Sequence, residues 1–315
     1  MLQYLIILLD DTSTSFCHYS LTPIPSPKGE GSRRLMPIET LRQGIRFGMM
    51  ENLMIQYVYP DYELPAEYME VIESIDHSKI KPTKDDADVV VLNGFADIDV
   101  EVPVVLRVGK GELFANADKV EALLGKASRL NVVITDVETF TEEDFEEYKA
   151  LLKQLSTKAE QMFLEGKALQ LNLLTDRMML SKMNNCGAGD TNITLAPNGK
   201  FYVCPAFYYE DETDCIGDLE HGFDIKNKQL YSIDHASICR HCDAYQCKRC
   251  IWLNRKMTLE VNTPSHEQCV LAHLERNASR DLLHNIRKHG IFLPEQEDIK
   301  EIDYLDPFDK RNEWQ

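Results

Sequence analysis

The sequence predicts an α/β protein in which parallel strands alternate with helices and a cysteine-rich segment follows. Over the first 180 residues, short apolar runs alternate with amphipathic stretches. The apolar runs are rich in Val, Ile and Leu and lack period-two alternation, as expected of parallel strands buried on both faces. Eight of the nine cysteines then fall between Cys186 and Cys269. This uneven distribution places a domain boundary near residue 180.

Six apolar runs are the expected strands: Tyr4–Leu9, Met54–Tyr59, Asp88–Asn93, Val102–Val108, Leu130–Thr135 and Leu169–Leu174, with a further strand possible near Ser78–Lys81. Helical spacing predicts helices over Ile38–Asn52, Ala66–Ser74, Glu112–Lys126, Glu142–Leu155 and Thr157–Glu165. Such crossovers favour a partial (β/α)6 TIM-like barrel over residues 1–180, with a doubly wound sheet as the alternative. The Pro- and Gly-rich segment 20–34 is a loop insertion, either a surface insertion, which we favour, or a substrate lid.

Charge and hydropathy exclude several classes of partner. The 34 Lys and Arg against 52 Asp and Glu give a net charge of −18, and no basic stripe is present, which argues against nucleic acid. The apolar run over residues 1–10 is too short to span a membrane and lacks the features of an export signal. We therefore expect a cytoplasmic protein with reduced thiols, where clustered cysteines more often hold metal than form disulfides.

The cysteine spacing predicts a metal site. A hairpin around Asn198-Gly199 brings Cys186 and Cys204 towards each other. Cys239-x2-Cys242-x4-Cys247-x2-Cys250 follows, and then Cys269. The four residues between the two Cys-x2-Cys pairs are far fewer than a zinc ribbon uses, whereas iron–sulfur proteins run closely spaced cysteines together. Spacing thus favours iron–sulfur and leaves zinc as the alternative.

The cysteine pattern resembles the SPASM domain, the C-terminal extension of many radical S-adenosylmethionine enzymes that mature ribosomal peptides. The resemblance implies a cluster domain over residues 181–275 with two [4Fe-4S] clusters behind a partial barrel. It implies that one cluster is held by Cys186, Cys204, Cys250 and, as a possible fourth ligand, Cys215, and the other by Cys239, Cys242, Cys247 and Cys269. The four-cysteine run is one residue shorter in two gaps than is usual in that family.

The radical-generating motif of those enzymes is missing. Their Cys-x3-Cys-x2-Cys follows the first strand, where this sequence has only Cys17, with Leu21 and Ile24 at the other two positions. No Gly-Gly-Glu-like turn follows the second strand, where the sequence reads Tyr59-Pro-Asp-Tyr-Glu-Leu-Pro65. The comparison implies a barrel that kept its auxiliary clusters and lost the cluster that cleaves S-adenosylmethionine, so this cofactor is not expected.

At a finer level the segments 8–19 and 57–65, with the cysteine block, resemble the CXXX-repeat peptide maturases. That resemblance implies a role in modifying a ribosomally made peptide with Cys-x-x-x repeats. It also implies two partners, the precursor peptide and a radical S-adenosylmethionine enzyme.

Polar residues at the expected strand ends offer a second kind of site. They are Asp10, Asp11, Asp61, Asn93, Asp136, Glu138, Asp176 and Arg177. Asp10 and Asp11 are the candidates for catalysis in an independent hydrolase or transferase, although such residues more often turn chains and cap helices. Cys17 beside His18 reads as a buried thiol rather than a nucleophile and base, and His241 as solvent-facing rather than a ligand. Residues 276–315 are expected to form an amphipathic helix, 278–289, and an acidic tail.

Overall fold

The computed structural model describes residues 2–13, 16, 34–167 and 169–299. Within it the chain forms two compact units, each made of two separate stretches. The first contains the residues up to Leu92 together with Gly187–Ser232, and the second contains Asn93–Cys186 and the residues from Ile233 onward. The insertion at 20–34 lies outside the described residues apart from Arg34, and so do Cys17, His18 and most of the acidic tail.

Parallel strands form the centre of the first unit. In spatial order the strands are β10 (Gly222–Phe223), β9 (Gly217–Asp218), β8 (Lys200–Tyr202), β7 (Asn192–Leu195), β1 (Tyr4–Leu8), β2 (Met54–Val58), β3 (His77–Lys81) and β4 (Val89–Asn93). β7, β1, β2, β3 and β4 run parallel, and β7 to β10 pair antiparallel. The predicted strands near residues 4, 54 and 88 are confirmed, as is the strand suspected near Ser78.

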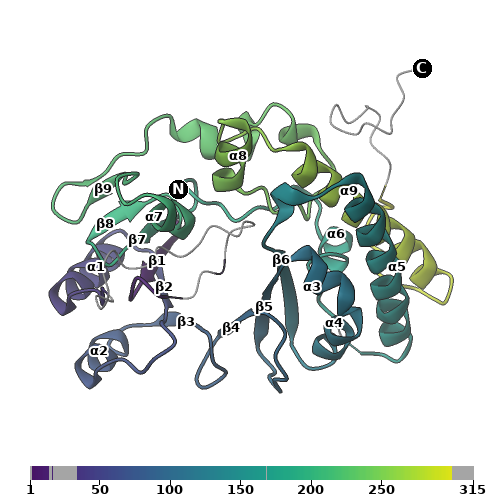
Figure 1. The fold of residues 1–315 in the computed structure, drawn as a ribbon, viewed down its shortest axis with the longest axis horizontal. Helices are drawn as coiled ribbons and strands as arrows, with labels where there is room; N and C mark the ends of the chain where they lie inside the picture. The colour runs from purple at the N-terminus through teal and green to yellow at the C-terminus, as the bar shows by residue number, and fades with distance from the viewer. Residues whose placement is uncertain (1, 14–15, 17–33, 168, 300–315) are drawn as a thin grey trace. The chain divides into compact units, whose positions relative to one another are not determined.

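Two helices lie beside these strands (Figure 1). They are α1 (Ile38–Met50) and α2 (Ala66–Ile72), and each follows a proline that sets the first turn. α1 approaches the sheet closely through Gly44, where an added Cβ would lie 2.4 Å from Leu195 Cδ2. The core between these layers is apolar, with Leu5, Ile7 and Leu41 fully buried. Burial on both faces explains why the strands lack alternation.

The predicted hairpin is confirmed around Asn198-Gly199. Gly199 has a φ of +77°, a backbone conformation that glycine adopts without steric cost. β7 and β8 pair through Thr194 with Tyr202 and Leu195 with Phe201. The short helix α7 (Pro205–Glu210) follows directly, and its first residue comes after Cys204. The hairpin therefore fixes the position of one predicted ligand.

The second unit contains two parallel strands, β5 (Pro103–Val108) and β6 (Arg129–Ile134), with α3 (Lys110–Ala115) and α4 (Ala117–Leu124) beside them (Figure 1). The single helix predicted over Glu112–Lys126 is wrong, because Asn116 leaves helical geometry and splits it.

The strand predicted over Leu169–Leu174 is also wrong. Only Leu171 makes an isolated bridge, to Leu130. The side-chain amide of Asn172 then donates to the Val132 carbonyl and accepts from its N–H, both at 2.9 Å. A side chain thereby takes the place of main-chain pairing, and the chain turns into α6 (Thr175–Met179).

Two long helices pack against each other in the second unit, α5 (Glu142–Leu164) and α9 (His266–Arg287) (Figure 1). The sequence predicted two helices where α5 is continuous. Both helices start with a capping box, at Thr141 and Ser265. In each, the cap side chain accepts from the backbone N–H three residues further on, and the side chain of that residue accepts from the backbone N–H of the cap. α9 begins well before the predicted residue 278.

Short elements lie between α5 and α9 in the sequence. Among them are the 3-10 turns η2 (Lys228–Tyr231, in the first unit), η3 (Ile233–His235) and η4 (Cys239–His241), and the helix α8 (Ile251–Thr258). The short turn η1 (Val137–Thr139) precedes α5.

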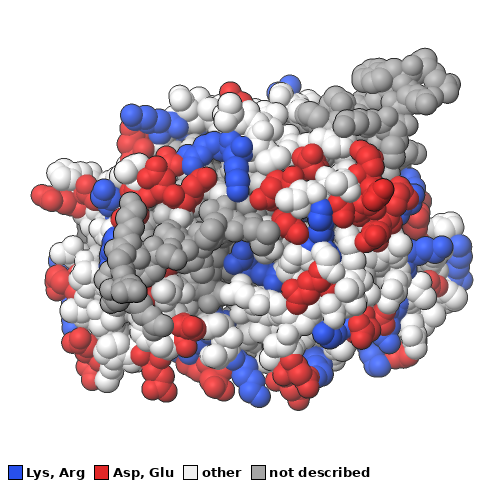
Figure 2. Space-filling view, in the orientation of Figure 1, with Lys and Arg blue, Asp and Glu red and all other residues white. Residues whose placement is uncertain are grey.

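The surface is rich in carboxylates, as a net charge of −18 requires. On the face drawn in Figure 2, the described Lys and Arg side chains form separate groups between carboxylates rather than a continuous stripe. Among the helices of the described residues, none combines the length and the apolar character needed to cross a bilayer.

Candidate metal centre

Four of the predicted ligands lie in a tightly turned segment of the second unit. η4 starts at Cys239, and the Cys242 N–H donates to the Cys239 carbonyl at 3.1 Å. The Ala244 N–H then approaches Cys242 Sγ at 3.4 Å, and the Cys247 N–H donates to the Ala244 carbonyl at 2.9 Å. Cys250 caps α8, because its Sγ accepts from the Leu253 N–H at 3.5 Å. Turns with backbone N–H groups directed at sulfur suit Cys-x2-Cys ligands, since they leave the thiolate accessible and partly neutralised.

Helix α9 supplies the fifth cysteine and an unpredicted histidine. The Cys269 N–H donates to the Ser265 carbonyl in the first turn of the helix. His273 stands four residues further on, so the two side chains share one face of α9. His273 Nε2 lies 3.5 Å from Cys242 Sγ. His273 was not among the predicted ligands, although the spacing Cys269-x3-His273 is a signal that could have identified it.

A buried guanidinium lies among the thiols. The Arg249 side chain is 1% exposed. It interacts electrostatically with Cys239 and Cys247, and also with Cys186 and Cys250, while its burial lowers its own pKa. The thiols are themselves desolvated: burial raises the pKa of Cys239 and of Cys247, and for Cys247 the neighbouring Cys239 and Cys242 raise it further. Without metal these thiols are protonated, and a metal that replaced their protons would leave thiolates beside the cation.

An ion-pair network fixes the segment between the cysteines to the helices of the second unit. The Asp243 carboxylate accepts from Arg276 Nε at 3.1 and 3.0 Å and from Arg276 Nη2 at 2.6 Å. Arg177 Nε donates to the Asp243 carbonyl at 2.6 Å, and its guanidinium stacks on the Tyr245 ring. The loop that carries Cys242 and Cys247 is therefore held by two cations, one from α6 and one from α9.

A second set of contacts anchors the same loop one step further along. Gln246 Nε2 donates to the Ala272 carbonyl at 2.6 Å, and Lys248 Nζ donates to the Asn172 carbonyl at 2.9 Å. Lys248 also lies 3.8 Å from the buried carboxylate of Glu275, which accepts from the Tyr148 hydroxyl at 2.8 Å. Because burial raises the pKa of Glu275, the nearby Lys248 and Tyr148 are what favour its charged form.

The donor set fits an iron–sulfur centre in its chemistry. Thiolates are the ligands that iron–sulfur clusters use, and buried Cys239 and Cys250 with half-buried Cys242, Cys247 and Cys269 provide them from one unit. Within the described residues, no three His, Cys, Asp or Glu side chains converge closely enough to hold a single metal ion. The role of each of these cysteines as a ligand remains a prediction.

The other predicted ligands are divided between the two units. Cys186 is exposed and belongs to the second unit, as Cys250 does. Cys204 and Cys215 belong to the first unit, where Cys204 is buried at the start of α7 and Cys215 is half-buried before β9. Burial raises the pKa of the Tyr202 hydroxyl to about 12, and Cys215 contributes in the same direction.

The carboxylates of the first unit hold the loop after β1. Asp10 is fully buried, and its carboxylate accepts from the Thr12 N–H and the Tyr62 hydroxyl, both at 2.8 Å. Asp11 accepts a short hydrogen bond from the Tyr208 hydroxyl and lies 3.7 Å from Arg34. Burial raises the pKa of Asp11, an effect that Tyr208 and Arg34 oppose. The loop is thus fixed by its own carboxylates.

The strand-end residues of the second unit do not share one end of the sheet. Asp136 follows β6 and accepts from the Lys110 N–H at 2.8 Å. Asp176 instead pairs with Arg129, the first residue of β6, at 2.7 and 2.9 Å. The expected grouping of Asp176 with Asp136 is wrong, because the chain turns at Asn172 instead of continuing as a strand. Glu138 lies 3.6 Å from Lys256.

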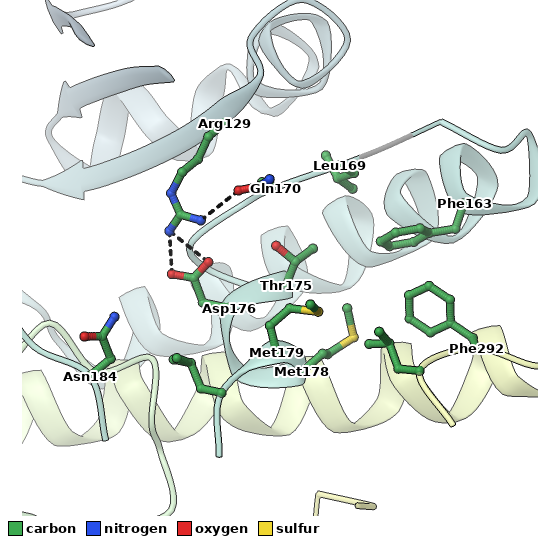
Figure 3. Close-up of a pocket in the computed structure, with 12 residues that line it drawn as sticks. Arg129, Phe163, Leu169, Gln170, Thr175, Asp176, Met178, Met179, Asn184 and Phe292 are labelled. Atoms are coloured by element: carbon green, nitrogen blue, oxygen red, sulfur yellow. Dashed lines mark hydrogen bonds and ion pairs between the residues drawn. The ribbon is translucent and has the colours of Figure 1, made fainter. Parts of the chain in front are cut away.

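The Arg129–Asp176 ion pair borders a cavity of about 590 Å³ (Figure 3). Figure 3 shows the guanidinium directed at both the Asp176 carboxylate and the Gln170 amide, with apolar side chains towards the other end. Those apolar side chains are Phe163, Leu169, Met178, Met179, Phe292 and Leu293. Since the two charges at the polar end are already paired, the cavity offers chiefly apolar surface.

Comparison with known proteins found similarity of fold only. No protein-family profile and no curated protein matches the sequence. Solved structures of anSMEcpe do match: the native protein with bound AdoMet has a TM-score of 0.58 at 13% identity, over 90% of this chain and 99% of that chain. A histidine-tagged form with bound AdoMet gives a TM-score of 0.59 at 14% identity, over 92% of this chain and 97% of that chain. At this identity the likeness shows the fold alone: the chain has a fold similar to that of anSMEcpe over nine-tenths of its length.

A further matching structure contains a peptide. Native anSMEcpe with bound AdoMet and the Cp18Cys peptide has a TM-score of 0.58 at 13% identity, over 90% of this chain and 99% of that chain.

Proposed function

We propose that this chain is an iron–sulfur protein that acts as a companion in the maturation of a ribosomally made peptide with Cys-x-x-x repeats. Region 181–275 holds two [4Fe-4S] clusters, one on Cys239, Cys242, Cys247 and Cys269 and the other on Cys186, Cys204, Cys250 and Cys215. The clusters supply one-electron transfer when bound, and the protein presents the peptide or relays electrons to a partner radical S-adenosylmethionine enzyme. It works in the reducing cytoplasm.

The observation that carries the proposal is Arg249. A fully buried guanidinium costs several kcal/mol unless an anion compensates it. Arg249 interacts with thiols of both predicted cluster sites, Cys239 and Cys247 for one and Cys186 and Cys250 for the other. Protonated thiols carry no charge, whereas thiolates on a metal centre do. Thiolates bound to metal in both groups would place negative charge near the buried Arg249 guanidinium, and this supports the proposal.

The partner is inferred from what the sequence lacks. The described part of the loop after β1 contains Asp10, Asp11, Thr12 and Ser13, and the full sequence holds no cysteine between Cys17 and Cys186. Without three thiolates in that loop the chain cannot build a cluster that cleaves S-adenosylmethionine, so a separate enzyme must generate the radical. A peptide substrate is supported by the fold, because anSMEcpe, which shares it, has been crystallised with a peptide.

The test is the metal and acid-labile sulfide content of protein purified without oxygen. We expect iron and sulfide near eight each per chain, as two four-iron clusters require. Arg249→Met should lower both, because the thiolates lose their buried counter-charge. Arg240→Met is the matched control, since Arg240 is an exposed arginine in the same segment. Zinc without sulfide, or equal iron in both variants, would contradict the proposal.

A zinc-stabilised scaffold without a redox role is the second candidate. One observation favours it: Cys239-x2-Cys242 lies against Cys269-x3-His273 through the contact between Cys242 and His273. Cysteine and histidine are both ligands that structural zinc sites use. Zinc in place of iron in the same measurement would select this alternative.

A further inference from the structure

One turn of α9 is fixed to the cysteine loop at three consecutive points. The Ala272 carbonyl accepts from Gln246, His273 contacts Cys242, and the Arg276 guanidinium binds the Asp243 carboxylate. The hydrogen bonds at Ala272 and Arg276 are both 2.6 Å long, and they lie on either side of His273 along the helix. These two independent hydrogen bonds therefore fix the position of the imidazole. His273 is thus directed at the sulfur by the packing of a regular helix.

We propose that His273 is a positioning residue of the iron–sulfur site on Cys239, Cys242, Cys247 and Cys269, and that its Nε2–H donates a hydrogen bond to the Cys242 thiolate. This inference rests on the proposed function. It adds to that function a residue outside the cysteine pattern that sets the reduction potential of this site.

The protonation state of Cys242 determines the direction of this hydrogen bond. While Cys242 is protonated, either group can donate across the 3.5 Å between Sγ and Nε2. A ligating cysteine has lost its proton, so its sulfur can only accept and the imidazole must carry the proton on Nε2. The Ala244 N–H, at 3.4 Å, is a second donor to the same sulfur. A metal-bound Cys242 would therefore be a thiolate with two directed donors.

Hydrogen bonds to ligand sulfur raise the reduction potential of an iron–sulfur cluster, because they stabilise the extra negative charge of the reduced state. The backbone donor at Ala244 cannot be removed by a side-chain change, whereas the donor at His273 can. Substitution at His273 therefore isolates one of the two contributions.

The experiment is a potentiometric titration of the full chain, purified without oxygen and followed by electron paramagnetic resonance. His273→Leu removes the donor and keeps the bulk, and His273→Gln keeps an N–H donor. His241→Leu is the control, because His241 is an exposed histidine of the same segment. We expect a more negative midpoint potential for one cluster in His273→Leu, a smaller shift in His273→Gln and none in His241→Leu.

The outcomes separate this inference from the function on which it rests. Wild-type protein without iron and sulfide overturns the proposed function, and the role of His273 falls with it. Wild-type protein with clusters whose potentials are the same in His273→Leu overturns the inference alone. If His273→Leu and His273→Gln lose iron equally, His273 is a ligand and the hydrogen-bond role is wrong. Loss of iron in His273→Leu with retention in His273→Gln supports the donor role.

Discussion

Arg276→Met tests whether the ion pair with Asp243 holds the cysteine loop in place. The Arg276 side chain is 3% exposed and that of Asp243 16%, so the substitution leaves a largely buried carboxylate without its bidentate partner. Removal of one partner from a buried pair costs about 3–5 kcal/mol. Arg177 Nη2 remains 3.8 Å from the carboxylate, which places the expected loss at the lower end, about 3 kcal/mol.

Urea unfolding followed by circular dichroism measures this loss as a lower midpoint. Arg280→Met is the matched control one turn further along α9, where the arginine is 37% exposed and pairs with Asp281, and it should cost under about 1 kcal/mol. The double variant Arg276→Met with Asp243→Asn should be more stable than Arg276→Met alone, because it removes the uncompensated charge. Equal costs for Arg276→Met and Arg280→Met would refute the reasoning.

Three further predictions concern close packing, a buried carboxylate and the metal. Gly44→Val should cost about 1–3 kcal/mol in urea unfolding because its side chain meets Leu195, whereas Gly111→Val, with nothing within 4 Å, should cost less. The native pKa of Asp11, read by carboxyl NMR, should lie above its usual 3.8 because of burial, and Tyr208→Phe should raise it further. Since the native state then binds the proton more tightly than the unfolded chain, the free energy of unfolding should fall as the pH rises from 3.8 through the native pKa of Asp11. A rise over this pH range would contradict the raised pKa. Removal of iron by chelation should lower the melting temperature, and an unchanged value would show that the thiols do not couple metal to folding.

The sequence predicted the parallel strands well, because burial on both faces leaves a compositional signature that does not depend on distant contacts. β1, β2, β5 and β6 lie within one or two residues of their predicted bounds. The hairpin at Asn198-Gly199 was equally predictable, since its turn requires a positive φ. The mixed α/β fold with mostly parallel strands followed from the alternation of apolar runs and helical patterns.

The errors arise where side chains replace backbone interactions. Nothing local indicates that Asn172 will bond to Val132, forty residues away, and end the predicted strand. A different error concerns continuity, because α5 runs unbroken over Glu142–Leu164 through the point where two helices were expected. Arg249 was not predicted for a related reason, because its significance depends on which thiols lie near it. The spacing Cys269-x3-His273 could have identified His273, but its contact with Cys242 is visible only in the three-dimensional structure.

The Asn172 amide has a consequence for the behaviour of the protein at high concentration. A strand at the end of a sheet exposes unpaired backbone groups that can recruit another chain and begin aggregation. On β6, the backbone N–H and carbonyl of Val132 are occupied by one side chain, and those of Leu130 by the backbone of Gln170 and Asn172. The edge of β6 is thereby closed to a further strand at Leu130 and Val132 without adding a strand to the fold. The Asn172 amide at Val132 and the backbone of Gln170 and Asn172 at Leu130 thus protect this part of the edge against intermolecular pairing.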